Sequence, residues 1–337
     1  MSRFHSALIS LAIPFVGLLG GAILVECLLR GYLALQPKPH PWSDRPNFYF
    51  AHEELPTAQD LPHLPKKPHD VFRIGVVGDS FTFAPYMQFT DAFPQKLESM
   101  LNLNSTSLQG EVINYGVPAY SLSHEVDVVK RAIAEEADLI ILQITLNDPE
   151  IKPLRPTGIQ THLRDPFGTF SPEGPLKTVF KYWKTSAFIA ERLHNTESHR
   201  KYKEYFLDLF ENPNSWNRYY KALKKVKRLS HHSKTPIVAF IFPLFGIPLD
   251  SRYPFWSIHE KLHSTLTELD IPYEDLQSIY AGIPLSRLQV IPNGDRHPNE
   301  IAHRMAAEEM YTWLSQHHLL PQELLIKLRY KTRTGIA

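Results

Sequence analysis

Residues 73–84, RIGVVGDSFTFA, form the stretch that decides the fold. A short apolar run at residues 74–77 ends in Gly78-Asp79-Ser80. An apolar run of this length that ends at Gly predicts a buried strand followed by a tight turn. In open α/β sheets, reactive groups gather at the carboxyl ends of strands, and Ser80 stands at such an end. Taken alone, Asp79 and Ser80 fit equally well as a cap of the next helix.

Strand and helix patterns alternate along the rest of the chain. The expected strands are residues 72–77, 111–114, 139–144, 236–242 and 272–275, and the expected helices are residues 92–103, 123–136, 215–229, 255–269 and 299–315. Strands that alternate with helices predict a parallel sheet that is covered on both faces. We therefore expect a three-layer α/β/α sandwich with a flavodoxin-like parallel sheet.

The N-terminal region has the pattern of a membrane anchor. Residues 7–25 carry no charge. At about 1.5 Å per helical residue, they span close to the roughly 30 Å hydrocarbon core of a bilayer. We expect the chain to contact a membrane through residues 7–29, as an uncleaved signal-anchor helix. A cleaved signal peptide is the alternative, but the apolar run is long for one and no clear small-x-small site follows it.

The sequence predicts four parts. Residues 1–35 form the membrane anchor, residues 36–70 a Pro-rich tether, residues 71–320 the α/β domain, and residues 321–337 a C-terminal tail. An insertion at about residues 148–214 is far longer than an ordinary connection between a strand and a helix. It is either a lid or substrate wall beside the site, or a structural cover of the sheet edge.

Composition excludes several classes of function. The 337 residues are 43% hydrophobic and 21% charged, which suits one large globular domain with additions. A net charge of +1 gives no indication of a nucleic-acid partner. One cysteine, Cys27, allows no intrachain disulfide. The 17 histidines are scattered, and no Cys or carboxylate set stands at zinc-site spacing, so we expect no metal.

A second polar motif lies far downstream of Ser80. Residues 293–299 read NGDRHPN and precede the last expected helix. A Ser, an Asp and a His on separate loops of one sheet are the parts of nucleophilic acyl chemistry. His297 could take the proton of Ser80, and Asp295 could hold the imidazole and stabilise the imidazolium. Either residue by itself would read as a surface Asp or a His at a helix start.

Four blocks in this order resemble the GDSL/SGNH hydrolase superfamily, in its branch of bacterial membrane-anchored, exported esterase- and acylhydrolase-like proteins. The blocks are Gly78-Asp79-Ser80, VINYGVPAYS at residues 112–121, Leu146-Asn147-Asp148 and Asp295-Arg-His297-Pro-Asn299. The resemblance implies the SGNH hydrolase fold over roughly residues 71–314, with Ser80 as nucleophile and no metal or organic cofactor. It also implies an oxyanion hole formed by the backbone N–H of Ser80, a backbone N–H of the second block, and the Asn147 amide.

Two positions depart from the family pattern. Ala119 stands where the family has Gly, and we assign it the second backbone donor, while Gly116 is read as turn-forming. Ala can offer its N–H unless the position needs a positive φ, where Ala is disfavoured. Asp295 precedes His297 by two residues, where the family more often shows three, which leaves open a Ser–His dyad. We expect His303 to serve in packing or capping.

The expected function is hydrolysis of carboxylic (O-acyl) esters through an acyl-serine intermediate, on a lipid or an acylated saccharide. One alternative is an SGNH-type O-acyltransferase or O-acetyl esterase that acts on cell-envelope polysaccharide. Another is a non-catalytic envelope-binding or assembly protein that keeps the fold. The exported members of the family imply that the catalytic domain lies outside the cytoplasm, in the periplasm or at the cell surface.

Overall fold

The computed structural model describes residues 2–36, 63–103, 107–150, 174–291 and 295–325, with the side chains of the first helix described from residue 13. Most of the expected tether, the start of the insertion, Asn293 and the end of the tail lie outside these ranges. The described residues form two compact units. One holds α1 (Ser2–Leu35), α5 (Pro175–Tyr182) and α6 (Lys184–Glu211) as far as Glu204. The other holds the remaining described residues.

A five-stranded parallel sheet, in the order β2-β1-β3-β4-β5, is the centre of the second unit. This order is the flavodoxin-like one and confirms the expected sheet. Each strand overlaps an expected strand: β1 is Val71–Gly78, β2 Gln109–Gly116, β3 Leu139–Ile144, β4 Ile237–Ile241 and β5 Tyr273–Asp275.

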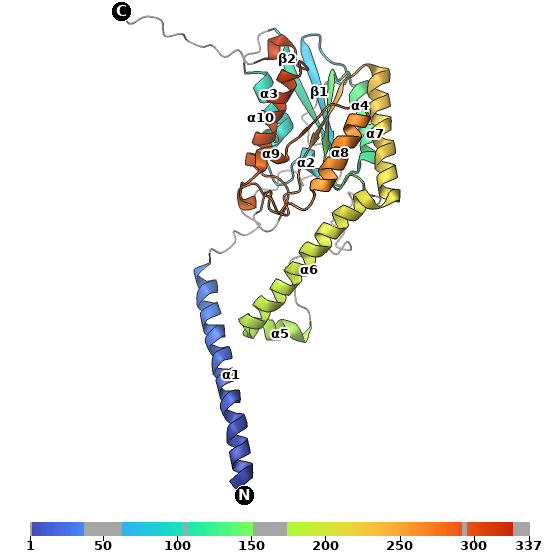
Figure 1. Cartoon of the computed structure of the whole chain (residues 1–337). Coiled ribbons are helices and arrows are strands. Elements are labelled where there is room, and N and C mark those ends of the chain that lie inside the picture. The colour runs from blue at the N-terminus through green and yellow to red at the C-terminus, as the bar shows by residue number, and fades with distance from the viewer. Residues whose placement is uncertain (1, 37–62, 104–106, 151–173, 292–294, 326–337) are drawn as a thin grey trace, which may run out of the picture. The chain divides into compact units, whose positions relative to one another are not determined.

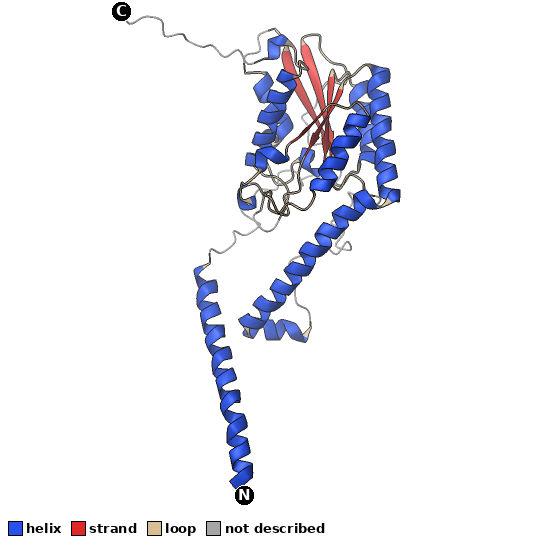
Figure 2. Cartoon of the chain, viewed as in Figure 1, coloured by secondary structure: helices blue, strands red, loops and turns tan. Residues whose placement is uncertain are grey.

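Helices cover both faces of the sheet, which confirms the three-layer architecture (Figures 1 and 2). On one face α3 packs beside α10, and on the other face α4 packs beside α7, with α8 near them (Figure 1). Right-handed crossovers require this division, because the chain moves one way from β1 to β2 and the opposite way from β2 to β5. The helices are α2 (Ser80–Phe83), α3 (Phe93–Leu101), α4 (Leu122–Ala134), α7 (Pro213–Ser233), α8 (Trp256–Glu268), α9 (Gln277–Tyr280) and α10 (Glu300–Gln316), with short 3₁₀ turns at Phe89–Asp91, Leu285–Arg287 and Gln322–Leu324.

The core lies on both sides of β1 and β3. All six residues of β3, LIILQI, are buried, and so are the last six residues of β1. A parallel strand that is covered on both faces reads as a continuous apolar run, which is why these two strands were recognisable in the sequence.

The topology brings three loops to one edge of the sheet. The strand order reverses at β1 and β3, and the connections leave the carboxyl ends of these two strands toward opposite faces. Such a switch point opens a crevice beyond the carboxyl ends of the strands. Ser80 follows β1, Ala119 follows β2 and Asn147 follows β3, so all three residues lie at this edge.

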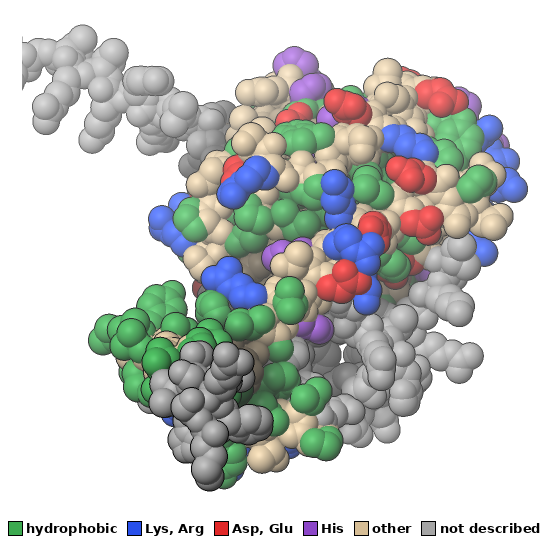
Figure 3. All heavy atoms as spheres, turned by 60° about the horizontal axis from the view of Figure 1, so that its bottom comes forward, with side chains coloured by type: hydrophobic (Ala, Val, Ile, Leu, Met, Phe, Trp, Pro, Cys, Tyr) green, Lys and Arg blue, Asp and Glu red, His purple; other side chains and the backbone are tan. Residues whose placement is uncertain are grey.

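Helix α1 carries the apolar N-terminal run. Its segment Ile13–Leu35, with a mean hydropathy of 1.8, is long and apolar enough to cross a membrane. The helix extends beyond the uncharged residues 7–25 at both ends. Hydrophobic side chains are exposed along its described part and gather there in the space-filling view (Figure 3).

Candidate active site

Ser80 is the first residue of α2, directly after the turn that ends β1. The side chain of Asp79 accepts a hydrogen bond from the Phe81 N–H at 2.9 Å and so caps this short helix. Both interpretations of the sequence therefore describe part of the turn. Asp79 is the buried cap, whereas the side chain of Ser80 remains partly exposed at the carboxyl edge of the sheet.

Two glycines let the nucleophile turn, residues 78–84, pack against the neighbouring strands. A Cβ at Gly78 would lie 2.3 Å from both Gln143 Oε1 and Thr82 Oγ1. A Cβ at Gly116 would lie 2.3 Å from the backbone nitrogen of Phe83. Larger residues at these positions would push α2 away from β2 and β3. Gly116 thus permits close backbone approach to α2. It is the last residue of β2, so the expected turn-forming role is not the one that it has in the structure.

Gln143 is a functional candidate that the sequence analysis missed. Its Oε1 accepts hydrogen bonds from the Asp79 N–H at 3.2 Å and from Thr82 Oγ1 at 2.9 Å. Its Nε2 donates to Thr145 Oγ1 at 3.0 Å. The side chain therefore braces the nucleophile turn from β3. The available signal was its place as the only polar residue of LIILQI.

His297 connects Ser80 to Asp295. Its Nε2 lies 2.9 Å from Ser80 Oγ, and its Nδ1 lies 2.6 Å from Asp295 Oδ1. The same carboxylate oxygen accepts the backbone N–H of His297 at 2.8 Å. This second bond folds the carboxylate back toward the ring, so a spacing of two residues is short enough to reach Nδ1. The carboxylate thus lies within hydrogen-bond distance of the imidazole, as the expected Ser–His–Asp arrangement requires.

The histidine loop, residues 295–299, is held by its own backbone and by Asn299. The Val290 N–H donates to the His297 carbonyl at 2.9 Å. Asn299 Oδ1 accepts the N–H groups of Ile301 and Ala302 and caps α10. Its Nδ2 donates to the carbonyls of Arg287 and Gln289. The imidazole also lies 5.8 Å, centroid to centroid, from the ring of Phe81 in an edge-on contact.

Electrostatics favours charge separation between His297 and Asp295. Burial lowers the pKa of His297, but the charge and hydrogen bond of Asp295 outweigh it, and the net pKa is raised. Burial raises the pKa of Asp295, but the charge and hydrogen bonds of His297 lower it below its usual value. Asp295 is thus the anionic member, and it stabilises an imidazolium at His297.

The expected oxyanion donors lie on three loops of the same edge. The Ser80 N–H occupies the first position of α2, where a helix offers it no partner. The Ala119 N–H has no acceptor among the described residues. Asn147 Nδ2 donates one hydrogen to Asp79 Oδ2 at 3.0 Å, which leaves its second amide hydrogen available.

Ala119 has a φ of 63°, so the position does require the left-handed backbone conformation that favours Gly. Ala is disfavoured at a positive φ, so the backbone at Ala119 is strained. Strained non-glycine residues persist where the surrounding structure fixes them, often at functional sites. The turn around Ala119 is closed by a hydrogen bond from the Tyr120 N–H to the Val117 carbonyl at 3.2 Å.

Three buried carboxyl groups lie beneath this edge. Asp79, Glu125 and Asp148 are each at most 2% exposed. Burial raises the pKa of all three, and their mutual repulsion raises the pKa values of Glu125 and Asp148 further. Neither carboxyl oxygen of Glu125 has a hydrogen-bond partner in the part of the chain that the structure describes. Burial therefore opposes ionisation of these three groups, whereas the interaction between His297 and Asp295 favours the ionised form of each of those two residues.

Other polar groups stand apart from Ser80. His303 Nδ1 accepts the Phe93 N–H at 3.1 Å, and burial lowers its pKa to about 3, which fits the expected packing role.

One group among the described residues, His259, His263 and Asp275, could hold a metal ion, although no metal was expected. His259 and His263 stand four residues apart on α8 and so lie on one face of the helix. This spacing is a candidate metal-ligand pattern that the sequence prediction did not include. Both rings lie 2.7 Å from Asp275 Oδ2.

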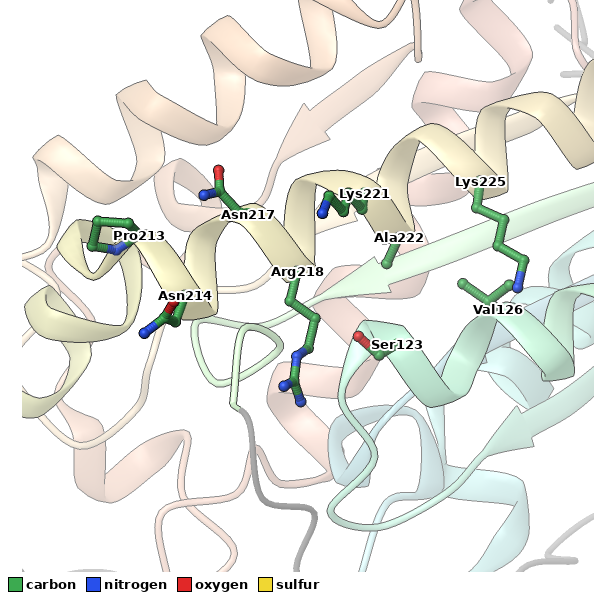
Figure 4. Close-up of a pocket in the computed structure, with 9 residues that line it drawn as sticks. All are labelled: Ser123, Val126, Pro213, Asn214, Asn217, Arg218, Lys221, Ala222 and Lys225. Carbon is green, nitrogen blue, oxygen red and sulfur yellow. The ribbon is translucent and has the colours of Figure 1, made fainter.

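A surface pocket of about 520 Å³ lies between α4 and α7 (Figure 4). Three cationic side chains of α7, Arg218, Lys221 and Lys225, line it together with Ser123 and Val126 of α4. Ser80, Asn147 and His297 are not among its lining residues, so this pocket is separate from the candidate active site.

The amino-acid sequence matches no protein-family model and no curated protein sequence. Several solved structures resemble its fold. A member of the lipolytic protein G-D-S-L family from Veillonella parvula DSM 2008 is 15% identical, with 73% of this chain and 99% of that chain covered and a TM-score of 0.39. Axe2, an acetylxylan esterase from Geobacillus stearothermophilus, is 12% identical, with 76% and 95% covered and a TM-score of 0.45. TesA is 12% identical, with 75% and 99% covered and a TM-score of 0.43.

The Veillonella parvula structure is described as a member of the lipolytic G-D-S-L family, the group that the sequence motifs resemble. At such identities and TM-scores these structures carry no argument about activity, which rests on the chain's own residues. In the order of its strands, and in Ser80, Asn147, Asp295 and His297 at one edge of its sheet, this chain is similar to the GDSL/SGNH hydrolases.

Proposed function

We propose that this protein is a serine hydrolase that cleaves carboxylic (O-acyl) esters through an acyl-serine intermediate. The observation that carries the proposal is the continuous path from Ser80 Oγ through both ring nitrogens of His297 to Asp295, with distances of 2.9 and 2.6 Å. A nucleophile, a base and an orienting carboxylate within hydrogen-bond distance are the arrangement that activates a serine.

In the first half-reaction, His297 Nε2 accepts the proton of Ser80 as Oγ attacks the ester carbonyl. Negative charge develops on the carbonyl oxygen, and the N–H groups of Ser80 and Ala119 and the amide of Asn147 are the donors for it. Asp295 stabilises the imidazolium. The tetrahedral intermediate then collapses, the bond to the alcohol breaks, and His297 returns the proton to the leaving alkoxide.

In the second half-reaction, His297 takes a proton from water as the water attacks the acyl-Ser80 carbonyl. The same three donors stabilise the second tetrahedral intermediate. Its collapse releases the carboxylic acid, and the proton returns from His297 to Ser80 Oγ. The chain's own residues supply every proton transfer in this sequence, and no step requires a cofactor.

The substrate class is an acyl ester of a lipid or a saccharide, and the catalytic domain lies outside the cytoplasm on an uncleaved α1. The uncharged run at residues 7–25, which is helical throughout, supports the anchor. Hydrogen bonds from the start of α6 to Glu26 of α1 support its retention, since cleavage after α1 would remove this partner. We further propose that the chain is organised as anchor, tether, α/β domain and tail at the boundaries given above, including the insertion at about residues 148–214.

A fluorophosphonate probe tests the proposal directly. The full-length protein in detergent should be labelled, whereas Ser80→Ala should not be. Labelling of both proteins at other residues, or of neither, would reject Ser80 as an activated nucleophile and would favour a non-catalytic envelope protein. Incubation with an acetyl donor and an oligosaccharide would show transfer if acetylated sugar exceeded free acetate.

A further inference from the structure

Glu26 is the first charged residue after the uncharged run at residues 7–25 of α1. Its carboxylate accepts hydrogen bonds from the backbone N–H groups of Lys184 and Thr185, each at 2.7 Å, and from Thr185 Oγ1 at 2.7 Å. These two N–H groups belong to the first turn of α6, where a helix leaves its donors unpaired and carries partial positive charge. Glu26 therefore provides an N-terminal cap for α6 from another helix.

Arg30 completes the link one turn later on α1. Its guanidinium pairs with Glu26 at 2.7 Å and donates to the carbonyl of Tyr182, the last residue of α5, at 2.7 Å. The ion pair thus holds residues 182–185, where α5 ends and α6 begins, at the middle of the α5–α6 corner (residues 176–193). On α1, Ala22, Glu26 and Leu29 are partly covered and share one face of the helix, while most of its other described residues are exposed.

The helices that meet at this corner expose large apolar side chains. Six large apolar side chains in this region are 45 to 68% exposed: Leu176, Val179, Tyr182, Trp183, Ile189 and Leu193. Positions 176, 179 and 183 recur at helical spacing, so one side of the corner is apolar. Lys177, Lys181 and Lys184 are interleaved with them. Basic residues beside an apolar and aromatic face are typical of helices that lie in a membrane interface.

We propose that the α5–α6 corner, residues 176–193, is immersed in the interfacial layer of the same bilayer that α1 spans, and that Glu26 fixes its depth. The uncharged residues 7–25 occupy the hydrocarbon core, so Glu26 and Arg30 lie at the headgroup level. The corner is hydrogen-bonded to those two residues and must lie at that level too. Tyr and Trp are the residues enriched there, and lysines complement anionic headgroups.

This proposal rests on the proposed anchor, and the experiment separates the two. The full chain with Cys27→Ala is placed in nanodiscs of phosphatidylcholine and phosphatidylglycerol, one copy per disc. A nitroxide is attached to a cysteine at one of four positions, introduced as Leu18→Cys, Val179→Cys, Ile189→Cys or Glu191→Cys. The accessibility of each label to oxygen, which partitions into lipid, is compared with its accessibility to a water-soluble nickel chelate.

Labels at positions 179 and 189 should favour oxygen, whereas the label at position 191, on the opposite face of α6, should favour the nickel chelate. The label at position 18 reports the anchor alone. If position 18 favours oxygen while 179 and 189 favour nickel, the anchor stands and the interfacial corner is rejected. If position 18 also favours nickel, the anchor itself fails.

Glu26→Gln tests the depth control. A Gln presents one acceptor oxygen and cannot serve all three donors of the α6 start, so the oxygen preference at 179 and 189 should fall while position 18 stays unchanged. An unchanged preference at all three positions would show that Glu26 does not set the depth. Dipolar broadening between labels in discs that hold two copies would show that a second chain, and not lipid, covers this face.

Discussion

The nucleophile turn and the histidine loop hold the two ends of one hydrogen bond by different means. The turn, residues 78–84, is fixed by side chains from other strands. Gln143 of β3 accepts from Asp79 and Thr82, and Asn114 of β2 donates to the Thr82 carbonyl at 2.9 Å. The loop, residues 295–299, is fixed by bonds within itself and to the segments just before and after it in sequence, residues 287–290 and the start of α10.

This difference shows where each half of the site is vulnerable. The position of Ser80 depends on strands that are distant in sequence, so a change in β3 should move it. The position of His297 depends on Asp295 and Asn299, which are near neighbours in sequence. Substitutions that remove a reacting group should have larger effects than substitutions that only shift the position of Ser80 or His297.

The largest effect should follow removal of either end of the hydrogen bond. Ser80→Ala or His297→Ala should lower kcat for p-nitrophenyl acetate hydrolysis by roughly 10⁴- to 10⁶-fold, because each removes a member of a unit that acts together. The measurement is the rate with purified full-length protein, with circular dichroism as the folding control. A folded Ser80→Ala variant that keeps its rate would place the chemistry elsewhere.

Asp295→Asn should lower kcat by roughly 10⁴-fold, because the amide can no longer stabilise the imidazolium or select its tautomer. The 2.6 Å distance between Asp295 Oδ1 and His297 Nδ1 is the basis of this expectation. Steady-state rates of Asp295→Asn and His297→Ala decide it. A loss of only a few-fold would favour a Ser–His dyad. Asp295 would then serve only to hold the backbone of His297 in place.

Asn147→Ala should lower kcat by about 10²- to 10³-fold with little change in KM, since the donor acts on charge that develops in the transition state. Asn147 follows β3, and its amide is oriented by Asp79 of the nucleophile turn. This prediction therefore tests the half of the site that depends on residues distant in sequence. Separate determination of kcat and KM tests it. An increase in KM alone would assign Asn147 to ground-state binding.

Gln143→Leu and Asn299→Ala compare the two kinds of support directly. Gln143→Leu leaves the Asp79 N–H and the Thr82 hydroxyl buried without partners, so the free energy of unfolding should fall by about 2 to 4 kcal/mol. Asn299→Ala removes a helix cap and should lower it by about 1 to 2 kcal/mol. Ser121→Ala is the control for loss of one partly buried side-chain hydrogen bond without loss of a cap, because Ser121 Oγ bonds to His124 Nδ1 at 2.9 Å but caps no backbone group of α4. Urea unfolding measures all three, and equal losses would contradict the distinction.

The smallest effect concerns pH. Only neutral His297 can accept the proton of Ser80, so kcat/KM should fall as pH drops through the pKa of His297. Because Asp295 raises that pKa, the acid limb should lie above the usual value of about 6.5. In Asp295→Asn the limb should move to lower pH. A limb that stays in place would show that Asp295 does not control the charge of His297.

The fold was predictable because its strands have a local signature. A parallel strand covered on both faces is a short apolar run, and β1 and β3 stand out from the polar segments beside them. The same buried surroundings concealed Gln143, since one polar residue in such a run has no meaning until its partners are known. The buried carboxyl group of Glu125 is hidden in the sequence for the same reason.

The site was predictable as a set of residues and not as a geometry. Motif order placed Ser80 and Asn147 at strand ends and His297 before the last helix, but spacing alone left the reach of Asp295 undecided. The bond between the His297 N–H and Asp295 Oδ1 decides it. The positive φ of Ala119 likewise depends on the loop around it, because a sequence of L-residues does not specify where a turn must enter the left-handed region.

The sequence by itself determined the sheet, the apolar N-terminal helix and the order of the polar blocks, because hydrophobic periodicity and strand-end residues are local properties. Only the tertiary structure decided how Gln143 braces the nucleophile turn, how Asp295 reaches the imidazole, and how Glu26 caps α6. Each of these depends on hydrogen bonds of definite length and direction, and between distant segments such bonds exist only after the chain has brought their partners together.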